Sequence, residues 1–309
     1  DFFKSRHTFV EIDPLSFPSS LRETTALLGQ PVCHAQLGFI PKLSKAAVKT
    51  TSVCLCGMAA DVLFGEGVDR RIDISAQIQR MMPWKFMRQA MIEGIQILGG
   101  LHVSSDRLQT LRQCLELELV DESSPTHPFN VGQHIVLQHA CHVFGKAAVE
   151  KAMLRRRSPL EPYQIAGSLK ERLSSLLLLT THQVCERMYQ IASFSGLRLL
   201  FPYMDSRMVR AALSMKADCR FSSEQTKKVL KDALEGYLPR ELIYRKKSAW
   251  GVPMTEWLED GGILSEFVEN INEYPFLRGK IETLKRKPDW FLWNLVTFDL
   301  WYKTFMCEG

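Results

Sequence analysis

The sequence has 309 residues, of which 46% are hydrophobic and 24% carry a formal charge, and no segment is dominated by glycine, serine or proline. Such a chain can bury a full-sized core, which excludes a largely disordered protein or a long flexible linker. The net charge of +5 is modest, and we expect no nucleic-acid partner. The basic run Arg155-Arg156-Arg157 fits a solvated loop or helix end, or a contact for an acidic partner or leader peptide.

Eight cysteines are spread over the chain without the paired spacing of a zinc site. Cys54 and Cys56 alternate in an apolar stretch, so both should lie on one face of a strand and serve packing rather than reactivity. The longest apolar run, Leu176 to Leu179, is too short to span a bilayer, and the charged N-terminus has no signal-peptide pattern. We therefore expect a cytoplasmic protein with reduced thiols and no membrane partner.

The N-terminal region mixes short apolar segments with turn signals. Phe9 to Asp13 is predicted to form a strand, followed by Pro14 and the start of a helix. Ser52 to Leu55 is a short, nearly continuous apolar run, followed by Gly57 and a helical stretch, which is typical of a buried parallel strand that enters a turn and a helix. Ligands bind at such carboxyl ends of strands.

From about residue 76 onward the pattern is mainly helical. Apolar residues recur at three- and four-residue spacing through Ile78 to Leu98, Leu108 to Leu119, Val131 to Met153 and Leu169 to Ser195. The predicted fold class is therefore α/β, with a partial parallel sheet followed by a mostly helical region.

The C-terminal third contains shorter predicted elements. Asp205 stands at the N-cap position of a helix from Ser206 to Leu213. Thr226 to Leu234 is a further predicted helix, Pro239 opens a short one, and Arg245 to Pro253 is a basic, turn-rich loop.

Three segments carry a resemblance to a known family. The first, Ser52 to Gly65, reads SVCLCGMAADVLFG and resembles the strand-turn-helix segment VLSGEGADELFG of the asparagine synthetase family. The resemblance implies that Cys56, Gly57 and Met58 contact the nucleotide, with glycine allowing close backbone approach, and that Asp61 holds Mg²⁺ bridging the phosphates. Alternatively, Asp61 is a first-turn carboxylate that complements the helix dipole.

The second segment, Phe201 to Val209, is similar to the family's PFLDhrlVe, where it shapes the pocket and starts a helix. We assign Asp205 a capping role in preference to substrate contact. Upstream, Arg198 stands where many asparagine synthetases carry glutamate in a SLEvR segment, so the amino-acid substrate is left open.

The third segment runs from Thr226-Lys227 to the loop RKKSAWGVP, which ends at Pro253, and looks like the family's TKxLLR and RxKxGFGVP. The resemblance implies that Lys227 and Lys247 are catalytic, because both reach the leaving pyrophosphate and the second steadies charge near the acyl centre. For Lys227, the first turn of an exposed helix is an equally simple interpretation.

Two departures from the family bear on catalysis. Met58 stands where asparagine-forming members have glutamate and β-lactam-forming relatives have tyrosine, and methionine cannot take a proton. Glu93, Tyr203, water or the substrate's phosphate would then accept it, although Glu93 also fits an exposed helix face. The family's pyrophosphate-binding loop SGGxDS is absent from the 309 residues, so we expect weak ATP binding by this chain alone and a partner chain or upstream segment that supplies the loop.

The resemblance covers nearly the whole chain and implies one synthetase domain over residues 1–309 with a PP-loop-type fold. It implies ATP and Mg²⁺ as cofactors and small-molecule or peptide carboxylates and amines as substrates. The activity would be amide-bond formation through an acyl-adenylate, as in asparagine synthetases, β-lactam synthetases and lasso-peptide cyclases. The alternatives are a non-catalytic scaffold or regulatory subunit, and asparagine synthesis from aspartate.

Overall fold

The computed structural model describes residues 2–65, 68–100, 106–116, 137–157, 169–220, 225–245, 251–286 and 288–307. In these segments the only sheet has two strands, β1 (Val53–Leu55) and β2 (Arg198–Leu200), which pair in parallel with Val53 opposite Arg198. The parallel strand predicted within Ser52–Leu55 is confirmed, but its predicted burial is wrong, because Val53 and Leu55 are 42% and 74% exposed. The α/β class with a small parallel sheet and a mostly helical remainder is also confirmed. All other described elements are helical.

The helices before β2 in the sequence are α1 (Phe17–Leu28), α2 (Ile40–Ala47), α3 (Ala60–Phe64), α4 (Val68–Met81), α5 (Lys85–Gly100), α6 (Asp106–Glu116), α8 (Leu137–Phe144), α9 (Lys146–Arg157) and α10 (Leu169–Phe194). Those after β2 are α11 (Ser206–Ser214), α12 (Ala217–Arg220), α13 (Lys228–Leu234), α14 (Arg240–Ile243), α15 (Met254–Leu258), α16 (Ser265–Asn270), α17 (Ile281–Lys285) and α18 (Trp290–Tyr302). Short helical turns are η1 (Pro14–Ser16), η2 (Ala35–Phe39), η3 (Pro202–Met204), η4 (Ile271–Glu273) and η5 (Lys303–Cys307).

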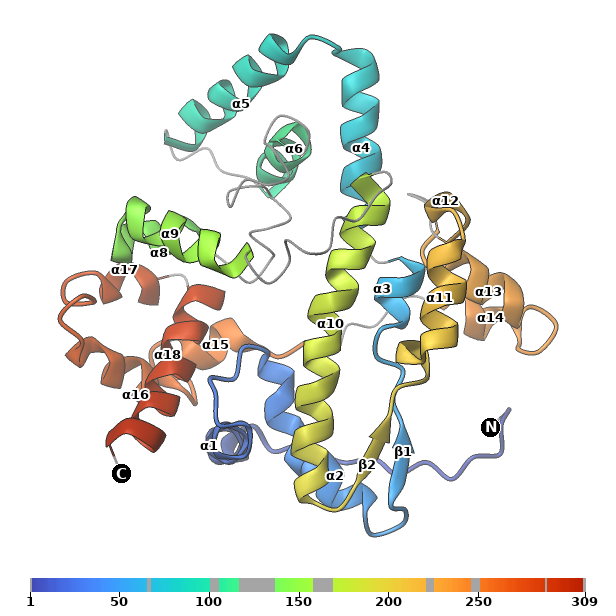
Figure 1. Cartoon of the computed structure of the whole chain (residues 1–309). Helices are drawn as coiled ribbons and strands as arrows, with labels where there is room; N and C mark the ends of the chain where they lie inside the picture. The colour runs from blue at the N-terminus through green and yellow to red at the C-terminus, as the bar shows by residue number, and fades with distance from the viewer. Residues whose placement is uncertain are drawn as a thin grey trace.

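The long helix α10 forms the centre of the molecule (Figure 1). It contacts α1, α2 and α3, and through the turn at Gly196 it leads directly into β2. The sheet therefore lies against the C-terminal half of α10, with α3, α11 and α13 beyond the carboxyl ends of its strands (Figure 1). The predicted site residues Cys56, Gly57, Met58, Asp61 and Lys227 occur at this end of the sheet.

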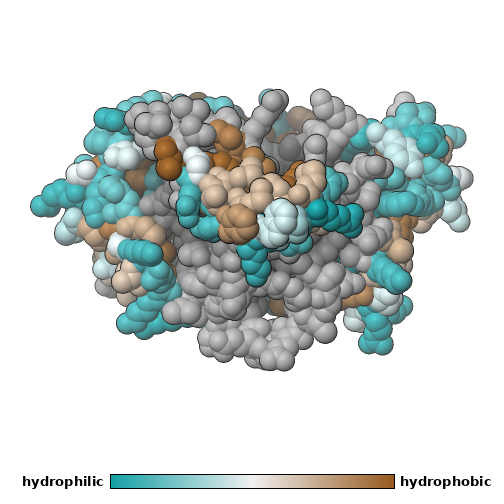
Figure 2. Space-filling model, turned by 90° about the horizontal axis from the view of Figure 1, so that it is seen from above, coloured by the Kyte–Doolittle hydropathy of each residue, from teal (hydrophilic) through white to brown (hydrophobic). Residues whose placement is uncertain are grey.

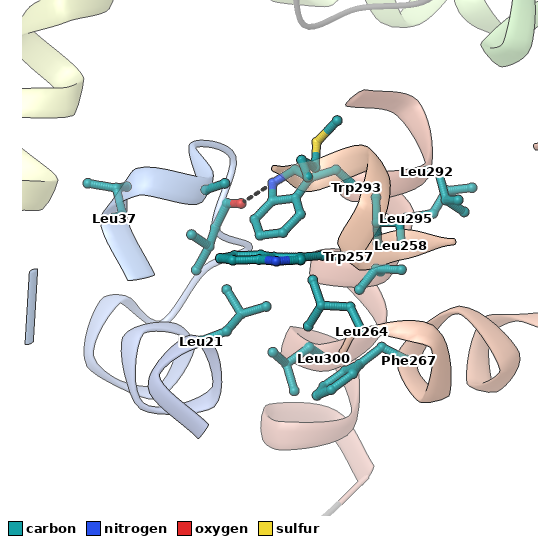
Figure 3. Packing of buried hydrophobic residues seen from close by; sticks show 14 of the residues in the cluster. Leu21, Leu37, Trp257, Leu258, Leu264, Phe267, Leu292, Trp293, Leu295 and Leu300 are labelled. Carbon is teal, nitrogen blue, oxygen red and sulfur yellow. Dashed lines mark hydrogen bonds between the residues drawn. The ribbon is translucent and has the colours of Figure 1, made fainter. Parts of the chain in front are cut away.

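The main core joins the first forty residues to the last sixty. Trp257 and Trp293 are buried between Leu21 and Leu37 of the N-terminal helices and Leu258, Leu264 and Leu300 of the C-terminal ones (Figure 3). The Trp293 indole N–H donates to the carbonyl oxygen of Val32 at 2.8 Å, drawn as the dashed line in Figure 3. Chain segments at opposite ends of the sequence thus share one core.

A second, smaller core lies among α4, α5 and α6. It consists of five buried residues, which are Ile78, Ile92, Ile95, Cys114 and Leu115. Figure 2 looks onto the end of the molecule that α4 and α5 form, where brown and tan apolar residues lie between teal hydrophilic ones. Met81, Trp84 and Phe86, at the corner between these helices, are 61–74% exposed.

The predicted strand at Phe9 to Asp13 is wrong. Residues 4–13 have no regular structure, and Phe9 is 81% exposed, so this stretch has no strand partner in the described part of the chain. Alternating apolar residues favour a strand only where a neighbouring strand accepts the backbone hydrogen bonds. Here Asp13 instead caps η1, its side chain accepting from the Leu15 N–H at 3.0 Å.

The helical predictions are confirmed with changed boundaries. The pattern from Ile78 to Leu98 is divided between α4 and α5, because Pro83 lies in the intervening turn and proline disfavours a helical residue before it. Gly145, in the left-handed conformation with φ 84°, similarly separates α8 from α9. The parts of the predicted helices that fall within 117–136 lie outside the described residues.

Candidate active site

The candidate site begins where β1 ends. The Cys56 N–H donates to the Leu200 carbonyl at 2.8 Å, which extends the pairing of β1 with β2 by one residue. Because parallel strands end at the same edge, the turn after Cys56 and the segment after Leu200 emerge side by side. Cys56 and Met58 are half-buried and pack against the main core, as does Cys54, which confirms the packing role predicted for Cys54 and Cys56.

Gly57 has open space beside its backbone. A Cβ atom placed on it would meet no atom within 4 Å, and its φ lies outside the left-handed region. The conformation of the chain therefore does not require glycine here. The unobstructed backbone suits a ligand that approaches closely.

Ala59 adopts the left-handed conformation, with φ 76°, at the N-cap of α3. This position aligns with the second glycine of the segment VLSGEGADELFG, and a residue with a Cβ atom pays about 1–2 kcal/mol for this conformation. The turn thus keeps the geometry that glycine adopts freely, even though alanine occupies it. It directs α3, with Asp61 in its first turn, away from the end of β1.

Asp61 and Lys227 form an ion pair between Oδ1 and Nζ. The two side chains are 36% and 33% exposed, respectively, so a solute can reach both. Lys227 precedes α13 and has a left-handed backbone, with φ 57°, and its N–H donates to the Phe64 carbonyl at 2.8 Å. The structure therefore brings together the predicted metal ligand and a predicted catalytic lysine from distant parts of the sequence.

Arg220 is a residue of this region that the sequence analysis did not identify. It is 1% exposed, and its guanidinium donates to the Leu63 carbonyl at 2.9 Å. The last turn of α3 is thus held by Arg220 and by the backbone of Lys227, at two consecutive carbonyls. The sequence has no signal for this role, because a buried arginine and a surface arginine look alike in a single sequence.

Lys247 and most of its loop, residues 246–250, lie outside the described residues. Tyr203 lies beside α3, its ring edge-on to Phe64 with centroids 6.3 Å apart. Glu93 is exposed on α5, where it accepts a hydrogen bond from Gln89 at 3.2 Å, on a helix that packs in the second core. Of the two side chains considered as proton acceptors, only Tyr203 contacts α3.

Asp205 is the N-cap of α11, as predicted, and its Oδ1 accepts from the Arg207 N–H at 2.9 Å. The Arg207 guanidinium donates to both carboxylate oxygens, at 3.0 and 3.2 Å. These side-chain hydrogen bonds, followed by the backbone one, lower the pKa of Asp205. The Asp205 carboxylate thus forms its hydrogen bonds within α11. Arg198, the first residue of β2, is exposed.

Cys185 of α10 is buried, and burial, together with the nearby Cys56 thiol, raises its pKa to about 12. A thiol with so high a pKa stays protonated at neutral pH and is a poor nucleophile. The eight cysteines are all free. Cys185 therefore stabilises the packing beneath the site and does not supply a reactive group.

A site for Mg²⁺ and ATP phosphates needs carboxylate oxygens for the ion and cationic groups for the phosphate oxygens. In the segments that the structure describes, no group of three or more histidine, cysteine, aspartate or glutamate side chains could hold a metal ion. Magnesium in nucleotide sites commonly has one or two protein carboxylates, with phosphates and water completing its shell. Asp61 beside Lys227 fits this mode of binding, with one carboxylate for the ion and one ammonium for phosphate oxygens.

No helix in the described part of the chain is long and apolar enough to cross a membrane. In comparisons with known proteins, neither a curated protein nor a solved structure matches the chain. The profile of the asparagine synthase family, in contrast, matches residues 1–302, which is nearly the whole sequence. The chain therefore belongs to the asparagine synthase family.

Proposed function

We propose that this protein forms amide bonds at the expense of ATP through an acyl-adenylate intermediate. A substrate carboxylate would attack the α-phosphate of ATP and release pyrophosphate, and an amine would then attack the acyl carbon and release AMP. Membership of the asparagine synthase family, whose domains use ATP, supports this proposal. The substrates would be a small-molecule or peptide carboxylate and an amine.

The observation that carries the proposal is the contact between Asp61 and Lys227 beyond the end of β1. Asp61 would hold Mg²⁺, and the Lys227 ammonium would bind the oxygens of the departing pyrophosphate. When bound, magnesium neutralises phosphate charge and orients the leaving group. Gly57 would lie against the nucleotide, and Lys247 would steady charge at the acyl centre.

The sheet itself suggests where further protein would bind. Parallel sheets are normally covered on both faces, yet Val53 and Leu55 of β1 are 42% and 74% exposed, and two strands form a small sheet. We propose that a partner chain or another segment of a longer protein covers this face and supplies the SGGxDS loop. A backbone nest of that type would bind pyrophosphate opposite Lys227.

A second candidate function is a non-catalytic scaffold of the same fold. Met58 favours it, because a thioether that packs against the main core cannot accept the proton of an incoming amine. The open backbone at Gly57 and the solvent-reachable Asp61–Lys227 pair favour catalysis instead. Asparagine synthesis, with aspartate as the carboxylate substrate, is a more specific version of the catalytic proposal.

ATP–pyrophosphate exchange with Mg²⁺ and a panel of carboxylates tests the proposal, on this chain alone and with a chain that contains SGGxDS. Lys227→Ala and Lys247→Ala should abolish exchange. Lys228→Ala is a matched control, because Lys228 is adjacent but pairs with Asp232 at 2.6 Å on the exposed side of α13, and it should retain exchange. Absence of exchange and of ATP binding in both formats would favour the scaffold.

A further inference from the structure

The start of helix α5 combines several features of an anion-binding site. It belongs to the second core, with α4 and α6, and not to the region of the Asp61–Lys227 ion pair. α5 has 16 residues, and its first turn contains no acidic side chain. In the described part of the chain, the N–H groups of Lys85 and Phe86 have no acceptor. Free N–H groups and the positive end of the helix dipole favour an anion at such a terminus.

Arg88, one turn into α5, is the second and independent observation. It is only 4% exposed, and its buried Nε has no hydrogen-bond partner. Arg88 lies on the face of α5 that carries Ile92 and Ile95, which pack in the second core. Helical side chains lean toward the N-terminus, so we expect the guanidinium to extend back over the first turn of α5 and its N–H groups.

In the described part of the chain, no carboxylate accepts a hydrogen bond from the buried Nε of this guanidinium. From Ile74 to Ile92 the sequence contains no aspartate or glutamate, whereas Arg80, Lys85 and Arg88 are basic. On α5 and α6, Glu93 accepts a hydrogen bond from Gln89 and Glu116 pairs with Arg112 at 2.7 Å, so both carboxylates have other partners. A buried charge without a partner is strongly unfavourable, so an anion from outside the chain would stabilise this region.

We propose that the N-terminus of α5 binds a phosphate-type oxyanion between the Arg88 guanidinium, the free N–H groups of the first turn and the Lys85 ammonium. A guanidinium binds two oxygens of such an anion in parallel, and the helix N–H groups bind a third. The anion is either free phosphate or pyrophosphate, or the phosphate of a larger molecule such as a nucleotide. This inference does not depend on the proposed function, since α5 packs in a core separate from that of α3.

Thermal unfolding in phosphate-free buffer, with added phosphate, pyrophosphate, AMP, ATP or acetate, tests the site. Phosphate and pyrophosphate should raise the midpoint temperature of the wild type, and Arg88→Met should weaken their binding at least about tenfold, because charged hydrogen bonds are lost. Arg88→Lys, which keeps the positive charge but not the paired N–H donors of the guanidinium, should bind phosphate with intermediate affinity. Arg80→Met, which removes an exposed arginine at the end of α4, should respond as the wild type does.

Two further comparisons make the outcome unambiguous. Lys227→Ala should keep the phosphate response, which separates this site from the proposed active site. In that variant, a stronger response to AMP and ATP than to free phosphate would identify a nucleotide as the source. Without phosphate, Arg88→Met should be at least as stable as the wild type, because an unpaired buried charge is removed. A clear loss of stability in that variant, or an equal response to acetate, would overturn the proposal.

Discussion

At the scale of single residues, a substitution at Gly57 can distinguish an effect on fold stability from an effect on ligand binding. Any residue can adopt its backbone conformation, and its surroundings have room for a methyl group. Gly57→Ala should therefore leave the free energy of unfolding unchanged or raise it by about 0.4–1 kcal/mol, because alanine restricts the unfolded chain. The same variant should bind ATP at least about tenfold more weakly if a nucleotide lies against this backbone.

Urea unfolding and ATP titration measure the two quantities on one protein. Gly196→Ala is an instructive comparison, because Gly196 has φ 77° in the turn between α10 and β2, so alanine there should destabilise the fold. Unchanged ATP affinity in Gly57→Ala would show that the open space at this turn has no role in nucleotide binding.

Asp205 gives a residue-scale prediction about pH. Since hydrogen bonds from Arg207 lower its pKa in the folded state, the carboxylate contributes stability that is fully present above its unfolded pKa of about 3.9 and is lost as the pH falls through the lower, folded value. The difference in melting temperature between the wild type and Asp205→Ala should accordingly be constant near neutral pH and vanish in acid.

Arg207→Leu removes the main cause of this shift. It should return the carboxyl pKa of Asp205 toward its ordinary value, which NMR titration of the side-chain carboxyl carbon would detect. If the pKa stayed low in that variant, the cap at the start of α11, and not the guanidinium, would be its principal cause.

At the scale of elements, helix α18 is anchored to the segment after α1 by two tryptophan N–H groups. Trp293 is fully buried and donates to Val32, whereas Trp301 is partly exposed and donates to Gly29 at 2.9 Å. Trp293→Phe should destabilise the protein by about 2–4 kcal/mol, because it leaves a buried carbonyl unsatisfied and a cavity in the main core.

Trp301→Phe is the matched control on the same helix. Water can satisfy the Gly29 carbonyl there, so the loss should stay below about 1 kcal/mol. Chemical denaturation of both variants gives the comparison, and equal losses would mean that the helix is held by general apolar burial and not by the buried hydrogen bond.

At the scale of the whole molecule, two cores of unequal size predict two levels of local stability. The small core of α4, α5 and α6 has five buried residues, whereas the main core joins both ends of the chain. Backbone amides of α5 should therefore exchange with solvent at least about tenfold faster than those of α18, through an opening that leaves the main core intact. Native-state hydrogen exchange followed by mass spectrometry measures both, and uniform protection would indicate a single cooperative unit.

The sequence by itself determined local features. Short-range chemistry predicted the strand before Gly57, the helix that Asp205 caps and the short helix after Pro239, and all three are present. The motif order also indicated the asparagine synthase family, which the match over residues 1–302 supports. In each case the information lies within a few adjacent residues or in their order along the chain.

Tertiary structure decided the rest. The stretch at Phe9 has strand composition but no strand to pair with in the described part of the chain, and the buried Arg220 bonds the Leu63 carbonyl of α3, far from it in the sequence. The contact of Asp61 with Lys227 likewise depends on how α13 folds back onto α3, through the bond from the Lys227 N–H to Phe64. Periodicity reports which face of an element is apolar, but only packing determines which faces meet.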